Sequence, residues 1–367
     1  MKEVLIDYFK LEAKETSIKR ELLAGATTFI TMVYIIFVNP SMMAEAGMDY
    51  GASFVGTCLA AAFACFAMGI FANWPVGLAP GMGLNAFFTY TVVGEMGYSW
   101  QIALTAVFIA GVIFLLISVT PLRRWILESI PLSLRISMGA GVGLFIGFIG
   151  LKSSGIIISN PVNYLSLGDL TKPEPYLGIF GFLIITILSI RKIPGSIILG
   201  ILAITLISIL TNKVEFSGFV SVPPSIAPIL FELDFYGALN VGIVSVVLTF
   251  LFVNLFDTAG TLLAVATTAN LVDERGKIEN LDRALKADST SSIVGTFVGC
   301  APVTSYVESS AGVSAGGRTG LTAVFVGMFF CLAIFVSPLA GIVPPYATAG
   351  ALIYVAMIML SGLEKLD

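Results

Sequence analysis

The amino-acid sequence predicts an all-α polytopic membrane protein, and two features support this fold class. Of the 367 residues, 57% are hydrophobic and only 11% are charged, whereas soluble domains carry about a quarter charged residues. Most of the chain consists of apolar runs long enough to cross a bilayer as helices, which need about 20 residues each. The sequence has no series of short segments with alternating polarity, so helices are favoured over a β-barrel.

Ten apolar segments are expected to be membrane-spanning helices. They are residues 21–45, 51–73, 100–120, 133–151, 176–190, 194–212, 238–266, 289–300, 319–339 and 345–362. Two further segments, 76–94 and 301–316, are apolar but rich in glycine and proline, so we expect each to be part extended and part half-helix. The charged stretch 273–288 (DERGKIENLDRALKAD) is expected to form a short surface helix.

The distribution of lysine and arginine predicts the orientation, because cytoplasmic loops carry an excess of these residues. If both broken segments cross the membrane, the N-terminus and residue 367 are cytoplasmic. The basic residues that then lie on the cytoplasmic side are Lys19, Arg20, Arg123, Arg124, Arg191, Lys192, those of the 270–288 loop, Arg318 and Lys365. Those that lie on the outer side are Lys152, Lys172 and Lys213.

An internal repeat is visible in the chain. The tripeptide Phe-Val-Asn occurs at 37–39 and again at 252–254. The pair Ala-Pro opens both broken segments, at 79–80 and at 301–302. The two matches have similar offsets and occur in the same order, and the two copies would cross the membrane in opposite directions. Inverted repeats with interrupted helices at matching positions are typical of secondary transporters that bind substrate near the midplane.

Two acidic residues lie where a membrane protein rarely has any. Asp257 is inside a long apolar run, and Glu308 is in the second broken segment. Intramembrane acids are costly and usually face a partner or a water-filled cavity, so these two are the first candidates for a substrate site. A purely architectural role is the alternative. Glu45, Glu95 and Asp288 fall at the ends of expected spans, where solvation explains them.

The two half-helices would direct free backbone N–H groups towards this site. Asn85 could donate and accept hydrogen bonds there, and Tyr306 could stack on a flat ligand, although either could instead be a structural residue. Carboxylates and N–H groups together suit a planar heterocycle, and the same acids could carry a proton. The remaining candidates are Gly83, Leu84 and Ser305 for binding, with Asn39, Asn254, Thr258 and Thr261 in support.

Composition also limits cofactors and partners. The chain has no histidine and its four cysteines lack CxxC spacing, so we expect no metal site, no disulfide and no cofactor. No basic run suggests nucleic acid. The amphipathic N-terminal segment has no cleavable signal peptide pattern.

Several motifs carry a family resemblance over essentially the whole chain. NWPVGLAPGMGLNAFFTYTV, FVNLFDTAGTL, TTFITMVYIIFVNPSMM and above all TSYVESSAGVSAGGRTG resemble the AzgA-like hypoxanthine/adenine/guanine permeases, within the xanthine/uracil permease group. The resemblance implies proton-coupled uptake of purine nucleobases, sodium being used by some relatives, and a dimeric assembly in the lipid bilayer. By matching motifs it assigns Asp257, Glu308, Asn85 and Tyr306 to the substrate site, with the two acids in proton coupling.

The resemblance further implies a fold of two inverted seven-segment repeats, with short strands in segments 3 and 10. Twelve of the fourteen segments are expected in this sequence. The implied divisions are a cytoplasmic N-terminus (1–20), a core domain (21–120 and 236–340) and a gate domain (131–212 and, in part, 344–367).

Two positions depart from the family pattern. Asn254 stands where relatives carry a second acid. Thr261 cannot titrate, whereas distant relatives have a titratable residue at that position. Proton coupling at these two positions is therefore in doubt. A xanthine/uracil-type permease, a passive channel or an anion carrier on the same fold stay open as alternatives, as do a binding-only receptor and an intramembrane enzyme.

Overall fold

The computed structural model describes residues 2–120, 132–216, 218–240, 242–269, 271–272 and 278–365. The chain folds into two compact units, each made of two stretches far apart in the sequence. Unit 1 combines Met1–Ser129 with Pro223–Phe335, and unit 2 combines Ile130–Val222 with Val336–Asp367. The candidate site residues all belong to unit 1.

Unit 1 contains the longest helices and the two broken segments. The elements of its first stretch are α1 (Lys2–Phe9), α2 (Ile18–Met32), α3 (Ile35–Glu45), α4 (Tyr50–Ala67), the π-helix η1 (Met68–Ala72), β1 (Leu78–Pro80), α5 (Met82–Ala86), the π-helix η2 (Phe87–Glu95) and α6 (Trp100–Ser118). Those of its second stretch are the 3-10 helix η3 (Ala227–Ile229), α11 (Phe235–Asn240), α12 (Val244–Thr268), α13 (Leu281–Phe297), β4 (Val303–Ser305), α14 (Ser309–Ser314) and α15 (Gly320–Ala333), followed by the 3-10 helix η4 (Ile334–Val336).

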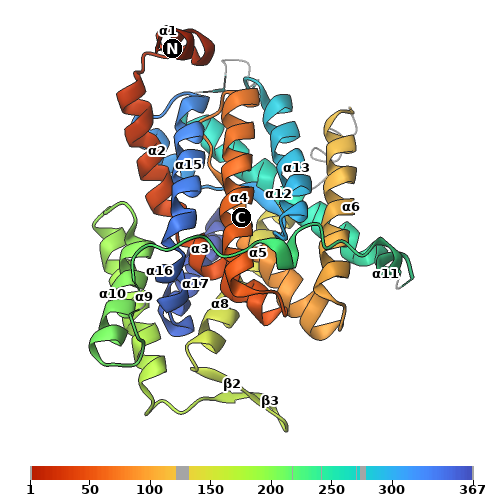
Figure 1. Ribbon diagram of the computed structural model, residues 1–367, viewed down its shortest axis with the longest axis vertical. Helices are drawn as coiled ribbons and strands as arrows, with labels where there is room; N and C mark the ends of the chain where they lie inside the picture. Colours follow the sequence, from red (N-terminus) through yellow and green to blue (C-terminus); the bar gives the residue numbers. More distant parts are fainter. Residues whose placement is uncertain are drawn as a thin grey trace. The chain divides into compact units, whose positions relative to one another are not determined.

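The helices of unit 1 pair elements from its two stretches. Helix α15 packs against α2 and α4, and α13 packs against α4 and α6, as Figure 1 shows for the upright helices of this unit. Short polar side chains start several of them: the Asp49 carboxylate accepts from the Ala52 N–H at 2.7 Å at the start of α4, and Ser17 and Ser99 cap α2 and α6 in the same way. Such caps satisfy backbone donors that the first helical turn leaves free.

Unit 2 is a smaller helical unit. Its elements are α8 (Leu132–Ser153), β2 (Ile157–Asn160), β3 (Tyr164–Leu167), α9 (Pro173–Ile190), α10 (Ser196–Leu210), α16 (Ser337–Ile342), α17 (Pro345–Leu360) and the 3-10 helix η5 (Ser361–Lys365). Helix α17 packs against both α8 and α9. Gly143, Gly147 and Gly150 form one stripe of α8 that faces α17, and small residues at this spacing let two membrane helices approach closely.

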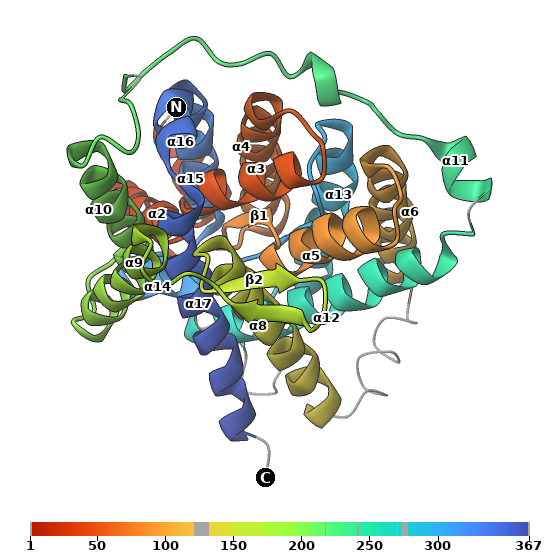
Figure 2. The same ribbon diagram turned by 90° about the horizontal axis from the view of Figure 1, so that it is seen from below.

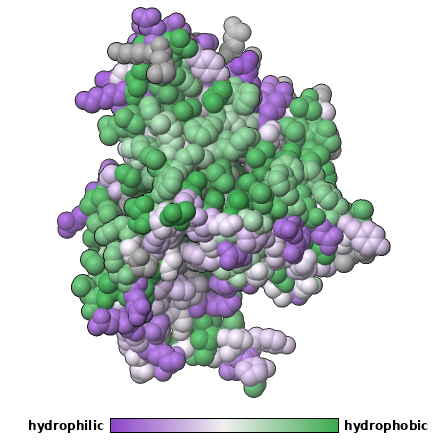
Figure 3. All heavy atoms as spheres, in the orientation of Figure 1, coloured by the Kyte–Doolittle hydropathy of each residue, from purple (hydrophilic) through white to green (hydrophobic). Residues whose placement is uncertain are grey.

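The membrane fold predicted from composition is confirmed. Among the described residues, seven helical segments are long and apolar enough to cross a membrane: Ile18–Glu45, Tyr50–Ala72, Trp100–Ser118, Pro173–Ile190, Val244–Thr268, Gly320–Ile342 and Pro345–Glu364. Two shorter apolar helices, Gly139–Ser153 and Ser196–Leu210, accompany them. On the visible face of unit 1, hydrophobic residues cover the helices, and hydrophilic residues gather around the end where α1 lies (Figure 3).

One expectation about the loops was wrong, and the structure adds a strand pair on which the sequence analysis made no prediction. The charged stretch 273–288 does not form a separate surface helix, because its residues 281–288 are the first half of α13; residues 273–277 lie outside the described part of the chain. The region after α8 was not expected to contain strands, yet β2 and β3 pair as an antiparallel hairpin. The Asn160 side chain closes its turn by accepting from the Val162 N–H at 2.8 Å, as asparagine often does in turns.

Candidate functional site

The two broken segments meet as a pair of short antiparallel strands inside unit 1. Leu78 pairs with Ser305, Ala79 with Thr304 and Pro80 with Val303, and all six residues are buried. Helices α3 and α4 pack against β1, and α5 follows it in the chain (Figure 2). Two backbone bonds extend the pairing, from Tyr306 N to Gly77 O at 3.0 Å and from Gly81 N to Pro302 O at 2.9 Å. The expected change from extended chain to half-helix is confirmed in both segments, because α5 follows β1 and α14 follows β4.

Glu308 lies where the second half-helix starts. It is the residue before α14, and its carbonyl oxygen accepts the first bond of that helix, from Ala311 N at 2.9 Å. Its side chain is half-buried, and one carboxylate oxygen accepts a hydrogen bond from the hydroxyl group of Tyr34 at 2.9 Å. Tyr34, at the junction of α2 and α3, is almost completely buried. Sequence reasoning missed Tyr34, because a tyrosine in an apolar run gives no sign of its partner.

Asp257 lies on an accessible face of α12. Asp257 is exposed within unit 1, as are the residues Gly260 and Ala264 on the same side of the helix, and a Cβ atom added at Gly260 would meet nothing within 4 Å. The Asp257 carboxyl group is close enough to Glu308 to interact with it electrostatically, and it is also near the side chain of Thr304 in β4. Unit 1 therefore brings the two predicted acids together beside the paired strands.

A third acid, Asp288, lies behind these two and overturns the expectation that it is solvated. Its side chain is 0% exposed and lies near the middle of α13, because that helix begins well before the span predicted from hydropathy. The Thr258 hydroxyl group donates to Asp288 Oδ1 at 3.0 Å, and the Ser305 hydroxyl group donates to Oδ2 at 2.9 Å. Glu45 and Glu95, which were also expected to be solvated, are exposed.

The asparagines of the two repeats lie in buried hydrogen-bond networks. Asn85 Nδ2 donates to Asn39 Oδ1 at 2.7 Å, and Asn39 Nδ2 donates to the Thr57 hydroxyl group, also at 2.7 Å. Asn254 Nδ2 donates to the Ser292 hydroxyl group at 3.4 Å. The Oδ1 atoms of Asn85 and Asn254 are both buried without a hydrogen-bond partner among the described residues. Each therefore keeps one acceptor that a ligand or a water molecule could satisfy.

The remaining candidates differ in what they offer a ligand. The Tyr306 ring is only 6% exposed, and its hydroxyl group donates to the carbonyl oxygen of Pro80 at 2.5 Å, so it ties the two strands together. The Ser305 hydroxyl group is already bonded to Asp288, and the Leu84 side chain is buried. Gly83 and Thr261 are half-buried. Their roles in binding stay predictions.

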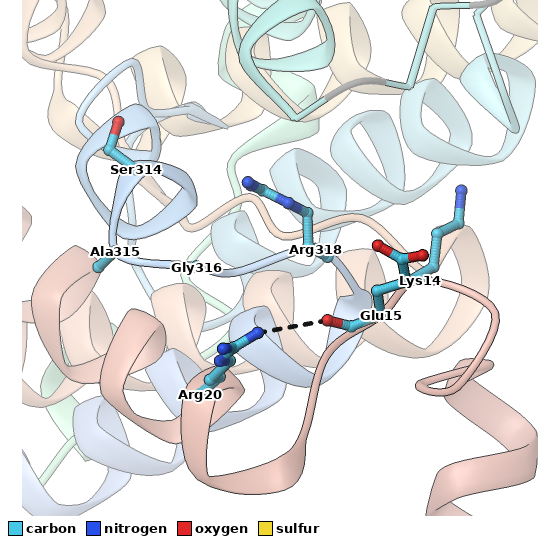
Figure 4. A pocket seen from close by; sticks show the side chains of 7 residues that line it. All are labelled: Lys14, Glu15, Arg20, Ser314, Ala315, Gly316 and Arg318. Atoms are coloured by element: carbon cyan, nitrogen blue, oxygen red, sulfur yellow. Dashed lines mark hydrogen bonds between the residues drawn. The ribbon is translucent and has the colours of Figure 1, made fainter.

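A separate open pocket lies near the N-terminal end of unit 1. It is lined by Lys14, Glu15, Arg20, Ser314, Ala315, Gly316 and Arg318 (Figure 4). All three cations already have partners in the protein. Lys14 forms an ion pair with Glu279 at 2.6 Å. Arg20 donates to the Glu15 carbonyl oxygen at 3.4 Å, and Arg318 donates to the carbonyl oxygens of Val313 and Gly317. This pocket contains none of the predicted site residues.

Comparison with known proteins decides the family. Residues 19–367 match the sequence model described as the Permease family. The chain belongs to this permease family. It is 49% identical over 359 residues to adenine permease AdeP of Escherichia coli (strain K12), a match that covers 98% of this chain and 81% of AdeP. It is 41% identical over 367 residues to guanine/hypoxanthine permease PbuO of Bacillus subtilis (strain 168), covering 98% of this chain and 85% of PbuO. The resemblance found in the sequence motifs is confirmed.

Solved structures confirm the fold class of this permease. The transmembrane domain of the cyanobacterium bicarbonate transporter BicA superposes with a TM-score of 0.71 at 15% sequence identity, covering 95% of this chain and 91% of that domain. At this identity the likeness concerns the fold alone. That fold is the inverted repeat of seven plus seven segments which the family resemblance implied. Membership of the permease family makes the chain a multi-pass membrane transporter rather than an enzyme.

Proposed function

We propose that this permease takes up purine nucleobases across the cell membrane. The observation that carries the proposal is the match over 98% of the chain to permeases named for adenine and for guanine and hypoxanthine. The site supports it, since Asp257 and Glu308 place two hydrogen-bond acceptors near each other beside the paired strands. A purine offers ring and exocyclic N–H donors, which carboxylates accept.

We infer that Asp257 and Glu308 bind the edge of the base, with Asn85 orienting it and Tyr306 lining the site. The same two acids would accept the coupled proton. In this proposal unit 1 corresponds to the core domain and unit 2 to the gate domain, and alternating access exposes the site of unit 1 to each side of the membrane in turn. A cytoplasmic N-terminus and a homodimer in the bilayer complete the proposal, with sodium as the alternative coupling ion.

Uptake of radiolabelled adenine and hypoxanthine tests this function in a strain that lacks its own purine permeases. We expect saturable uptake that rises at lower external pH and is lost when an uncoupler is added. Competition by unlabelled purines and pyrimidines then identifies the preferred base. If the protein reaches the membrane but takes up no purine, the proposed function is wrong; linear uptake that is insensitive to the uncoupler would favour a channel.

Substitutions test the site itself. Asp257→Asn and Glu308→Gln each remove a charge with little change in shape, and we expect each to abolish uptake while surface expression persists. Glu95→Gln is the matched control, because Glu95 is exposed at the end of η2, and it should transport like the wild type. Wild-type uptake by both site variants would remove this site from the proposal.

A further inference from the structure

Asp288 is completely buried, and in the described part of the chain no cation lies on the elements packed against its helix. Helix α13 packs against α4, α6, η1 and β4, and none of these elements contains a lysine, arginine or acidic residue. Their titratable side chains are the phenol of Tyr50 and the thiols of Cys58 and Cys65, all in α4. An ionised carboxylate in an apolar interior is costly unless it is paired. Asp288 therefore depends on hydrogen bonds and on its own protonation state.

The charged group that faces Asp288 is another acid. Asp257 of α12 interacts with Asp288 electrostatically. On α13 itself, the charged residues Asp282, Arg283 and Lys286 are all exposed, and Lys286 points to the other side of the helix because it precedes Asp288 by two positions. The elements packed against α13 contain no cation. Ionising both neighbouring carboxyl groups at the same time is therefore unfavourable.

Two threonine hydroxyl groups connect these acids. Thr258 donates to Asp288 Oδ1 at 3.0 Å. The hydroxyl oxygens of Thr258 and Thr304 lie 3.1 Å apart, and either one can be the donor. The Thr304 side chain is in turn close enough to the carboxyl group of Asp257 to interact with it. The order of the chain is thus Asp288, Thr258, Thr304 and Asp257, and it leads from a buried acid to an exposed one.

Counting protons along this chain shows what it requires. A hydroxyl group supplies one proton and accepts through two lone pairs. The chain has three contacts but only two hydroxyl protons, so a third proton must come from one of the carboxyl groups. When Asp257 carries it, every hydroxyl group donates towards Asp288. When Asp288 carries it, every hydroxyl group donates towards Asp257. Both arrangements satisfy all three contacts.

We propose that Asp257 and Asp288 share one proton, which passes between them through the hydroxyl groups of Thr258 and Thr304. In the transfer the O–H bond of Asp257 breaks and its proton joins Thr304. The former Thr304 proton joins Thr258, and the former Thr258 proton joins Asp288 Oδ1. Three O–H bonds break and three form, and one negative charge moves from Asp288 to Asp257. No proton enters or leaves the protein.

The function of the shared proton depends on the proposed purine transport. A base that donates an N–H group to Asp257 binds more strongly when that side chain is ionised, because hydrogen bonds to a charged acceptor are stronger, and Asp288 then holds the proton out of contact with the ligand. When the base leaves, the proton returns to Asp257. Asp288 is therefore a proton reserve for the accessible acid. A purely structural Asp288 would instead only accept hydrogen bonds from Thr258 and Ser305, and it would exchange no proton with Asp257.

Infrared spectroscopy tests the shared proton without any purine. The C=O stretch of a protonated carboxyl group is compared in the wild type, Asp257→Asn, Asp288→Asn and the double variant, purified in lipid vesicles near neutral pH in H2O and in D2O. We expect each single variant to keep the band at a shifted frequency and the double variant to lose it. An unchanged band in the double variant, or a band lost in either single variant, would overturn the proposal.

Substitutions of Thr304 test the path and leave both acids in place. Thr304→Val keeps the shape of the side chain but removes its hydroxyl group, and we expect purine uptake to fall by about a hundredfold, in the range of proton-transfer effects, with equilibrium binding of adenine retained. Thr304→Ser restores the hydroxyl group and should restore uptake. Thr296→Val is the matched control, since among the described residues the Thr296 hydroxyl group bonds within its own helix, to Ile293 O at 2.7 Å. Uptake by Thr304→Val at the wild-type rate would overturn the proposal.

The two experiments separate this proposal from the transport proposal. A wild-type protein that neither binds nor takes up purines would refute the proposed function, while the spectra would still show whether one proton is shared. If the protein takes up purines but its spectra show no shared proton, only the inference about Asp288 is refuted. The Thr304 variants also provide a result if Asp288→Asn does not fold.

Discussion

At the scale of single residues, Glu21 shows how a buried acid can be purely structural. Its side chain is 0% exposed, and its carboxylate accepts from the backbone N–H groups of Arg318, Thr319 and Thr322 at 3.0, 3.3 and 3.1 Å. Arg318 precedes α15, Thr319 is its N-cap residue and Thr322 lies in its first turn, and a carboxylate there also suits the positive end of the helix dipole. Glu21 therefore joins the start of α15 to α2.

Replacing Glu21 by alanine removes the carboxylate that accepts from these three N–H groups. We expect Glu21→Ala to lose about 1–3 kcal/mol of stability, the usual cost of unpaired buried groups, and to lower the midpoint of thermal unfolding of the purified protein in detergent. Glu12→Ala, an exposed acid just before α2, is the control and should leave the midpoint unchanged. Equal midpoints for the two variants would show that the cap contributes little.

Asp257 and Glu308 could be found from the sequence, but Asp288 could not. The first two stand out because their neighbours in sequence are apolar or weakly polar. Asp288 follows a run containing Asp282, Arg283 and Lys286 and precedes serine and threonine residues, so hydropathy places it outside the membrane. In the structure those serines and threonines are mostly buried, and Asp288 takes its hydrogen bonds from other elements. Hydropathy cannot distinguish a polar residue facing water from one facing another polar side chain.

At the scale of elements, glycine decides how closely helices approach. Gly69 in η1 and Gly320 at the start of α15 lie backbone against backbone: a Cβ atom added at either would collide with the carbonyl oxygen of the other. The Gly320 N–H group also donates to Asn73 Oδ1 at 2.7 Å. A side chain at either position would force the two elements apart.

We therefore expect Gly69→Ala to destabilise unit 1 by about 1–3 kcal/mol, as overpacking usually does. Gly139→Ala in α8 is a matched control, because nothing lies within 4 Å of its added Cβ atom, and alanine should stabilise that helix by up to about 1 kcal/mol. Thermal unfolding of the two purified variants measures both effects. If Gly69→Ala were as stable as the control, the crossing would be looser than the structure shows.

Some elements could be predicted and others could not, for a definite reason. Proline and glycine at 79–83 and 301–302 weaken a helix locally, so both broken segments were predicted. The π-helices η1 and η2 were not, because an extra residue per turn leaves no mark on an apolar sequence. The β2–β3 hairpin was missed as well, since a short exposed strand pair has no hydrophobic periodicity to reveal it.

At the scale of the whole molecule, the inverted repeat explains why the two broken segments pair as they do. Related strands that cross the membrane in opposite directions run antiparallel when they meet, and β1 and β4 do so. The repeated Phe-Val-Asn and Ala-Pro strings therefore predicted a symmetric centre. They could not predict which side chains occupy it, because Asn85 and Glu308 stand on equivalent half-helices but have different chemistry.

The orientation of the chain gives a prediction about every segment before α9. Five expected crossings, 21–45, 51–73, 76–94, 100–120 and 133–151, separate Glu3 from the hairpin at Val162. An odd number places the two positions on opposite sides of the membrane, with Glu3 inside according to the basic residues. Both side chains are exposed, so a cysteine at either position should react with a maleimide that cannot cross the membrane.

In a variant without the four native cysteines, we expect Val162→Cys to be labelled in intact cells and Glu3→Cys only after the cells are permeabilised. The cysteine-free protein is the control and should carry no label. If both cysteines were labelled only after permeabilisation, the number of crossings between them would be even, and the broken segment 76–94 would then turn back within the membrane instead of crossing it. Because the inverted repeat requires that segment to cross, the same result would also contradict the inverted repeat.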